Sequence, residues 1–333
     1  MKNKILKWGI KTFLITVGIY ASICFTLIYW PIKLEKNIEN YDFSSVKKHS
    51  EINSGTEQWL KMRDGQEIFS RIYKSKSNDV MILIHGSGSE SRYLSEIANE
   101  IASRNIATVI TPDVRGHGRN KGKRGDIDFI GQLENDIEDL IHFSNKKLYA
   151  NKIILAGHSS GGGFILRYIG NPNNRKVDKA ILIAPYLGYK APTVKPNSGG
   201  WVIVALKRII GLSMLNNLGI KKLNTLPVLF FNRPKNINDS LQVPSYSYNM
   251  VMNFDSKNYE QEIKNIEIPC LVLVGKKDES FYPEKFPIVF KPSKKFTEVE
   301  IMENVKHLDI VKNKLTFKLI EEWNEKNKTV ANN

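Results

Sequence analysis

The sequence contains few of the residues that build cross-linked or metal-bound proteins. Only two cysteines occur among its 333 residues, Cys24 and Cys270, and they stand in unlike surroundings. Neither a disulfide framework nor a CxxC metal site is available, and we expect no metal and no other cofactor. Internal repeats and low-complexity blocks are also missing. The composition, with 41% hydrophobic and 25% charged residues, is that of an ordinary globular protein.

Acidic residues are scarce relative to basic ones, 34 against 49, which gives a net charge of +15. The lysines are spread along the whole chain, and no zinc-finger, RRM-like or helix-turn-helix signature accompanies them. We therefore attribute the charge first to solvated lysine faces and second to attraction to an anionic membrane. We expect no nucleic-acid partner and infer no obligate protein partner.

Charge is completely absent from residues 12–32. At about 1.5 Å per residue, a helix of this length reaches roughly 30 Å, the thickness of the hydrocarbon core of a bilayer. Trp8 precedes the run, and Tyr29 and Trp30 stand at its far end, where interfacial aromatic residues belong. We expect residues 1–32 to form a single membrane anchor. A buried helix of a soluble protein is the alternative.

The charges on either side of this run predict its orientation. Two lysines follow closely, Lys33 and Lys36, and they are offset by Glu35 and Glu39. Four lysines precede the run: Lys2, Lys4, Lys7 and Lys11. The positive-inside rule then predicts a single-pass protein of the cell membrane with its bulk on the extracytoplasmic side. A cleaved signal peptide is disfavoured because no A-x-A site follows, and Ile23 before Cys24 disfavours lipoprotein processing.

Beyond a polar tether over 33–55, strand-like and helix-like segments alternate through 56–326, before a short tail at 327–333. Expected strands are fully apolar, as in VMILI, ATVIT, KIILA, KAILIA and PCLVLVG. This pattern predicts an α/β fold with a mostly parallel central sheet and helices on both faces. The alternation lapses at about 186–266, which predicts an inserted helical cap. Within the cap, residues 200–220 and 227–231 are strongly apolar.

The segment GHSSGGG, residues 157–163, lies between a strand-like run and a helix-like run. A G-x-S-x-G pattern in this setting is typical of the strained turn that exposes a nucleophilic serine, here Ser159. Gly157 and Gly161 would remove the Cβ atoms that clash in such a turn. A flexible loop is the plainer interpretation. A phosphate loop is disfavoured because no Lys-Ser/Thr pair follows the glycines.

A nucleophilic serine needs a base and an orienting acid. The chain has six histidines. One lies in the tether, one at a solvent-facing helix position and three in glycine turns, which leaves His307 as the expected base. Asp278 follows an apolar strand between Ser159 and His307 in chain order and is the expected acid, with Glu279 as the substitute. Asp309 lies too close to His307 and begins the last helix instead.

Four motifs together resemble those of the α/β-hydrolase superfamily, in the branch of monoacylglycerol lipases, lysophospholipases and serine aminopeptidase-like proteins. They are HGSGSESRY (85–93), DVRGHGRNKGKRG (113–125), GHSSGGG (157–163) and VGKKDESFYP (274–283). The first is one residue shorter than the family pattern, Asn120 replaces the usual serine, and Ser160 replaces the usual Met or Leu. The resemblance covers about 56–326.

The resemblance implies a serine hydrolase with the triad Ser159, Asp278 and His307. Its oxyanion would be bound by the backbone N–H groups of Ser87 and Ser160, and His85 and His117 would hold their turns. We expect a carboxylic ester substrate that resembles a monoacylglycerol or a lysophospholipid. The basic residues beside the apolar runs of the cap suit anionic head groups. A peptidase, a thioesterase and an inactive membrane-anchored binding protein of the same fold are the alternatives.

Overall fold

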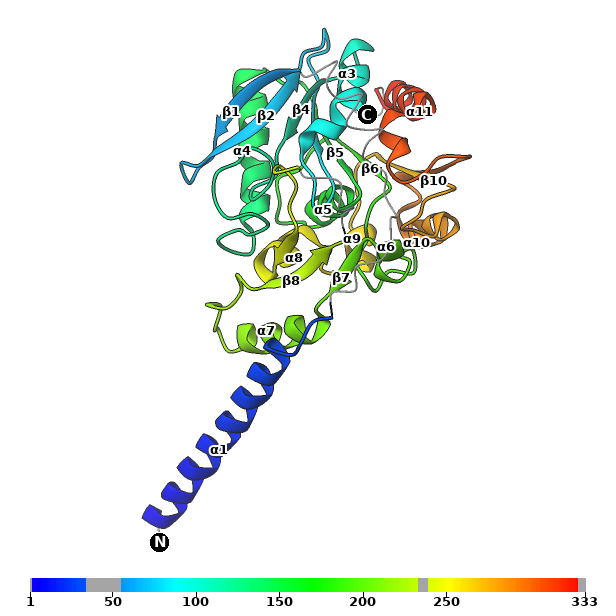
Figure 1. Cartoon of the computed structure of the whole chain (residues 1–333). Helices are drawn as coiled ribbons and strands as arrows, with labels where there is room; N and C mark the ends of the chain where they lie inside the picture. The colour runs from blue at the N-terminus through cyan, green and yellow to red at the C-terminus, as the bar shows by residue number, and fades with distance from the viewer. Residues whose placement is uncertain (1, 34–54, 233–238, 329–333) are drawn as a thin grey trace.

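The computed structural model describes residues 2–33, 55–232 and 239–328. The predicted tether, apart from its two end residues, and most of the predicted tail lie outside these residues. The main sheet has eight strands in the order β1-β2-β4-β3-β5-β6-β10-β11 (Figure 1). Its strands are β1 (Thr56–Lys61), β2 (Glu67–Tyr73), β3 (Val80–Ile84), β4 (Thr108–Pro112), β5 (Ile153–His158), β6 (Lys179–Ile183), β10 (Cys270–Gly275) and β11 (Thr297–Met302).

The sheet is parallel from β4 to β11, which confirms the mostly parallel arrangement. Only β1 and β2 depart from it. They form an antiparallel hairpin around Gly65, whose φ of 85° suits glycine in a tight turn, and β2 pairs antiparallel with β4. In a parallel sheet the carboxyl ends of the strands meet at one edge, and the loops that follow β3, β5, β10 and β11 therefore converge there.

Helices cover both faces of the sheet. Two of them, α4 (Gln132–Lys147) and α5 (Ser160–Ile169), belong to one buried apolar cluster. Two others, α3 (Ser95–Ser103) and α11 (Lys314–Lys326), belong to a second cluster on the opposite face. In the sequence, Phe129, Leu133, Ile137 and Leu140 recur at helical spacing, which predicts that α4 includes Phe129. Gly131 adopts a φ of 109°, however, so the helix begins after it and Phe129 stays exposed.

The cap is not purely helical, which corrects one expectation. Residues 227–231 form β8 (Pro227–Phe231), which pairs antiparallel with β7 (Val202–Val204) and β9 (Ser245–Ser247). Short apolar runs are ambiguous between strand and helix, and here hydrogen bonding to two partner strands decides the outcome. The helices of the cap are α6 (Asn197–Gly200), α7 (Leu206–Asn217), α8 (Tyr248–Phe254) and α9 (Tyr259–Lys264); α10 (Phe286–Val289) follows β10.

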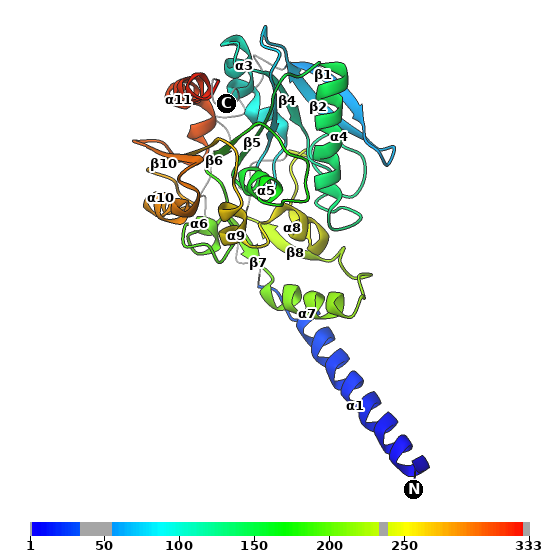
Figure 2. The same cartoon turned by 180° about the vertical axis from the view of Figure 1, so that it is seen from behind.

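The N-terminal helix α1 (Lys2–Ile28) projects away from the rest of the molecule, beneath α7 (Figures 1 and 2). Residues Lys4–Ile28 are long and apolar enough to cross a membrane, and 6% of their most apolar stretch is buried within the protein. An uncleaved anchor and a signal sequence share these features. The helix begins well before the uncharged run and includes the lysines ahead of it.

The junction of β5 and α5 depends on close backbone contacts at its glycines. A Cβ atom added at Gly157 would lie 2.4 Å from the carbonyl carbon and oxygen of Gly161. One added at Gly163, inside α5, would lie 1.9 Å from the carbonyl oxygen of Tyr186. Contacts this short are impossible without movement of the backbone. Any larger residue at these positions would push α5 away from the sheet.

We predict that Gly163→Ala destabilises the protein by more than about 1 kcal/mol, because overpacking of this kind typically costs 1–3 kcal/mol. Helix propensity alone predicts the opposite change, because replacing glycine by alanine inside a helix raises the free energy of unfolding by about 1 kcal/mol. Thermal unfolding followed by circular dichroism in detergent micelles measures the difference. The matched control is Gly9→Ala in α1, where an added Cβ meets no atom within 4 Å. A stabilised Gly163→Ala protein would contradict the prediction.

Candidate active site

Ser159 lies at the sharp turn between β5 and α5. Its backbone adopts φ 56° and ψ −121°, an angle pair that residues with a Cβ atom rarely adopt. The turn is held by two hydrogen bonds: the N–H of Ser159 donates to Ile183 O at 2.9 Å, and Tyr186 N–H donates to Ser159 O at 3.0 Å. This is the strained strand-to-helix geometry that the sequence motif predicts.

The two other residues of the predicted triad lie beside Ser159. His307, in the loop after β11, has its Nε2 atom 3.0 Å from Ser159 Oγ. Its Nδ1 atom lies 2.7 Å from Asp278 Oδ2, in the loop after β10. The structure therefore brings together Ser159, His307 and Asp278 in one hydrogen-bonded chain. This arrangement allows His307 to accept the proton of the serine hydroxyl while Asp278 accepts the N–H on the other side of the ring.

Asp278 is buried, and its carboxylate is held in the ionised form. Burial by itself raises the pKa of this carboxyl. The charge and hydrogen bond of His307, together with the backbone N–H groups of Ser280 and Phe281 at 2.8 and 2.9 Å, outweigh burial and lower the pKa below its ordinary value. Glu279, the predicted substitute, takes another position: its carboxylate accepts the backbone N–H of His307 at 2.9 Å.

The backbone N–H groups of Ser87 and Ser160 are the predicted oxyanion donors, and both residues line a cavity together with Ser159. Within the part of the chain that the structure describes, neither N–H donates a hydrogen bond. The backbone on the Ser87 side also approaches closely, since a Cβ added at Gly86 would lie 3.1 Å from Ser159 Cβ. Two donors without a protein partner beside a serine hydroxyl are suited to binding an oxyanion.

Two tyrosines fix the turn that carries Ser87. The Tyr93 hydroxyl accepts the N–H of Gly86 at 2.6 Å and lies 2.9 Å from Nδ1 of His158. His158 Nε2 lies 3.1 Å from the carbonyl oxygen of His307, to which it donates. The second tyrosine, Tyr246, accepts the N–H of Gly88 at 2.9 Å. Tyr93 belongs to the HGSGSESRY motif, but its role and that of Tyr246 in the cap were missed by sequence reasoning.

The buried histidines beside the site form hydrogen bonds with these turns and with Tyr246. His85 donates from Nδ1 to Gly86 O at 2.8 Å and accepts the N–H of Val114 on Nε2 at 2.9 Å. His117 lies with Nε2 2.6 Å from the hydroxyl of Tyr246. Burial lowers the pKa of His117 and of His158 to about 3, so both rings are neutral near pH 7.

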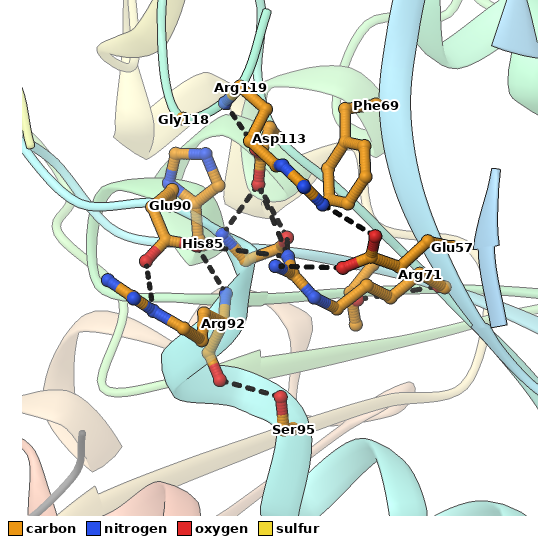
Figure 3. A network of polar contacts seen from close by, with 12 residues as sticks. Glu57, Phe69, Arg71, His85, Glu90, Arg92, Ser95, Asp113, Gly118 and Arg119 are labelled. Carbon is orange, nitrogen blue, oxygen red and sulfur yellow. Dashed lines mark hydrogen bonds and ion pairs between the residues drawn. The ribbon is translucent and has the colours of Figure 1, made fainter. Parts of the chain in front are cut away.

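A network of charged residues lies behind the same turn (Figure 3). Asp113, fully buried, accepts the backbone N–H of Ser91 at 2.9 Å and that of Arg119 at 2.8 Å. Arg71 lies 3.8 Å from Asp113 and 3.8 Å from Glu90. These contacts join the loop 85–93 to the loop 113–119. Removing one partner would leave a buried charge without its counter-ion, which is strongly destabilising.

The cavity in front of Ser159 has a volume of about 50 Å³, and residues of the cap line one side of it. Trp201, Val202 and Leu229 supply apolar walls, and Asp255 supplies a carboxyl group. Burial raises the pKa of Asp255 to about 7, although the charge of Arg167 opposes this shift. Sequence reasoning missed Asp255, because a lone acidic residue in the cap gives no signal of its own.

Comparison with known proteins identifies the family to which this fold belongs. Residues 75–308 match the family model described as serine aminopeptidase, S33, which is more than two thirds of the chain. The chain belongs to this family. The S33 assignment agrees with the resemblance to α/β-hydrolases, and the family model includes all three residues of the predicted triad.

Several relatives of this S33 protein are lipid hydrolases by name. A monoglyceride lipase homolog of monkeypox virus is 24% identical over 78% of this chain and 95% of its own. A monoacylglycerol lipase of Paleococcus ferrophilus has a TM-score of 0.59 at 20% identity, over 78% of this chain and 99% of its own. A bacterial membrane phospholipase A has a TM-score of 0.58 at 18% identity, over 99% of this chain and 100% of its own. Solved structures this distant show the α/β-hydrolase fold alone.

Other curated relatives match over a shorter stretch. An uncharacterised protein of Mycobacterium tuberculosis is 31% identical over 108 residues, which is 32% of this chain. The match spans 29% of the length of that relative.

Proposed function

We propose that this S33-family chain is a membrane-anchored serine hydrolase that cleaves carboxylic esters of lipids through an acyl-enzyme. The observation that carries the proposal is the hydrogen-bonded chain from Ser159 Oγ through His307 to Asp278, with distances of 3.0 and 2.7 Å. Three residues far apart in sequence meet in the geometry that serine hydrolysis requires. An inactive binding protein would have no need to keep this alignment.

The proposed reaction runs in two halves. His307 takes the proton of Ser159 as Oγ attacks the acyl carbonyl, and Asp278 stabilises the imidazolium that forms. The oxyanion accepts hydrogen bonds from the N–H groups of Ser87 and Ser160, each worth on the order of 3 kcal/mol in the transition state. His307 then gives its proton to the leaving alcohol, and the acyl group stays on Ser159. In the second half, water activated by His307 releases the fatty acid and restores the serine.

A lipid substrate is supported by the walls of the cavity and by the anchor. Trp201, Val202 and Leu229 present apolar surface in front of Ser159. Val202 belongs to β7 and Leu229 to β8, and Trp201 directly precedes β7, so the small sheet of the cap forms this apolar side of the cavity. An enzyme fixed to a bilayer by α1 meets acyl lipids at high local concentration. Monoacylglycerols and lysophospholipids are the substrates we propose.

A peptidase is the second candidate, and Asp255 favours it. A carboxylate inside the cavity suits the ammonium group of an aminoacyl substrate, which would offset the burial that raises its pKa to about 7. The apolar walls and the anchor favour the lipid instead. A thioesterase would use the same triad and the same acyl-enzyme. The acyl group of the substrate therefore does not distinguish a thioesterase from an esterase.

We predict that Ser159→Ala and His307→Ala each lower kcat for hydrolysis of a p-nitrophenyl ester by roughly 10⁴-fold or more, because the nucleophile and its base act as a unit. Asp278→Asn has the same direction of effect, since the imidazole loses its orienting acceptor. Ser103→Ala, which replaces an exposed serine of α3, is the control and keeps its activity. Substantial activity of the Ser159→Ala protein would rule out the proposed triad.

The substrate proposal predicts a ranking. Monoacylglycerol and lysophospholipid should give higher kcat/KM than an acyl thioester or an aminoacyl amide, because only the lipids use both the apolar walls and the membrane location. All four are compared side by side in mixed micelles, with the Ser159→Ala protein as the blank. If the amide is preferred, the lipid assignment is wrong and the peptidase takes its place; in that case Asp255→Asn should abolish the preference.

For the location we propose a single-pass protein of the cell membrane whose catalytic domain is extracytoplasmic, because four lysines of α1 precede its uncharged run. The protein should then stay in the membrane fraction in high salt, which removes proteins held by charge alone. Protease added to intact cells or spheroplasts should degrade the catalytic domain. Protection of that domain would reverse the orientation, and release by the salt wash would exclude the anchor.

A further inference from the structure

The C-terminal part of α1 packs directly against the cap helix α7. Cys24 and Ile28 are fully buried, whereas most of α1 is exposed. The contact is so close that a Cβ added at Gly211 of α7 would lie 2.8 Å from the carbonyl oxygen of Cys24 and 2.8 Å from Ile28 Cγ1. Figures 1 and 2 show the same crossing from opposite sides. The anchor is therefore joined to the cap by packing as well as by the chain.

Polar contacts link this crossing to the catalytic cavity. Arg208 of α7 donates from Nε to Ile28 O at 2.8 Å and from Nη1 to Pro227 O at 2.7 Å. Ile28 ends α1, and Pro227 begins β8, whose Leu229 lines the cavity in front of Ser159. At the other end of the crossing, the Tyr20 hydroxyl donates to Met214 O at 3.1 Å. One arginine thus ties the anchor to the strand that forms the cavity wall.

The length of α1 sets the level of α7 relative to a bilayer. The uncharged part of α1, residues 12–28, rises roughly 25 Å at 1.5 Å per residue. A hydrocarbon core is about 30 Å thick. A spanning α1 therefore crosses the core with these residues and keeps its four lysines on the far side. The last turns of α1, where Cys24 and Ile28 pack on α7, then lie near the boundary of the acyl chains and the headgroups on the side of the catalytic domain.

The exposed surface of α7 and of the residues that follow it suits a position at this boundary. Leu206, Ile210, Leu218 and Ile220 are exposed by 48%, 44%, 59% and 47%. An apolar groove of about 510 Å³ runs between α1 and the residues after α7, and Lys222 is among its lining residues. Exposed aliphatic side chains next to lysines are typical of segments that lie in the interface of a membrane.

We propose that α7 and residues 218–223, here called the interfacial platform, rest in the headgroup layer of a bilayer that contains anionic phospholipid. The acyl chains of the lipid cover the exposed aliphatic residues and fill the groove. Lys221 and Lys222 bind the phosphate groups. Arg208 and the α1–α7 crossing then hold the cavity of Ser159 next to the lipid surface. The inference rests on the proposed function in one respect: α1 has to span a membrane.

The test places an environment-sensitive fluorophore on the platform. Leu218→Cys is labelled and the full chain is reconstituted in phosphatidylcholine–phosphatidylglycerol vesicles with or without a lipid-borne quencher. Cys24 and Cys270 are buried, which directs the label to the new thiol. Tyr149→Cys is the matched control, because Tyr149 is 80% exposed and lies between α4 and β5, at the opposite end of the sheet strands. We expect quenching at 218 several-fold stronger than at 149.

Two further variants test what holds the platform in place. Gly211→Ile cannot keep the crossing and is combined with Cys24→Ser, because Cys24 is buried at the crossing. It should bring quenching at 218 toward the value at 149 while hydrolysis of a soluble short-chain ester continues. Lys221→Glu together with Lys222→Glu should weaken quenching on the anionic vesicles but not on pure phosphatidylcholine.

The outcomes separate this inference from the proposed function. Equal quenching at 218 and 149, with the protein retained in the vesicles after alkaline carbonate, would overturn the platform. Extraction of the protein by carbonate would show that α1 does not span the membrane. The platform would then be overturned as well, because it requires a spanning α1. Loss of ester hydrolysis in the parent protein would contradict the proposed enzyme, whereas strong quenching at 218 would still support the platform.

Discussion

The strained backbone of Ser159 is the constraint on which the rest of the site depends. A residue with a Cβ atom keeps a φ of 56° only if its surroundings enforce it. Here β5 and α5 enforce it, and three glycines permit the close packing. Gly157 lets β5 approach α5, and Gly161 and Gly163 let α5 approach the backbone of Ile84 and of Tyr186. The same turn places Oγ 3.0 Å from Nε2 of His307 and puts Ser160 in the lining of the cavity. A relaxed turn would therefore displace both the proposed nucleophile and one proposed oxyanion donor.

Much of this could be predicted from the sequence, since the signals are local. The apolar strands, the glycines at 157 and 161, and the positions of Asp278 and His307 after successive strands lie in short windows. The carboxyl ends of parallel strands converge, so residues that follow those strands meet even when about 150 positions separate them. These motifs could not indicate the residues that reach the site from elsewhere. Arg71 of β2 and Tyr246 of the cap contact the loops beside Ser159, and Asp255 of the cap lines the cavity. Nothing near them in the sequence marks these contacts.

The cap was predicted less well, for a physical reason. A five-residue apolar run such as Pro227–Phe231 satisfies both strand and helix patterns, and its hydrogen-bond partners, 202–204 and 245–247, decide between them. The packing of Cys24 against Gly211 is a contact between residues nearly 190 positions apart. The sequence predicted an N-terminal anchor and a cap but not the contact between them, which makes α1 part of the architecture around the cavity.

The role of Ser159 as nucleophile is tested most directly by mapping a covalent adduct. The protein is treated with a fluorophosphonate, digested, and the modified residue is located by mass spectrometry. A single adduct on Ser159, formed slowly or not at all in the His307→Ala protein, is the expected result. An adduct on another residue, or none on a protein that hydrolyses esters, would show that the hydrogen-bonded chain of Ser159, His307 and Asp278 is not the catalytic apparatus.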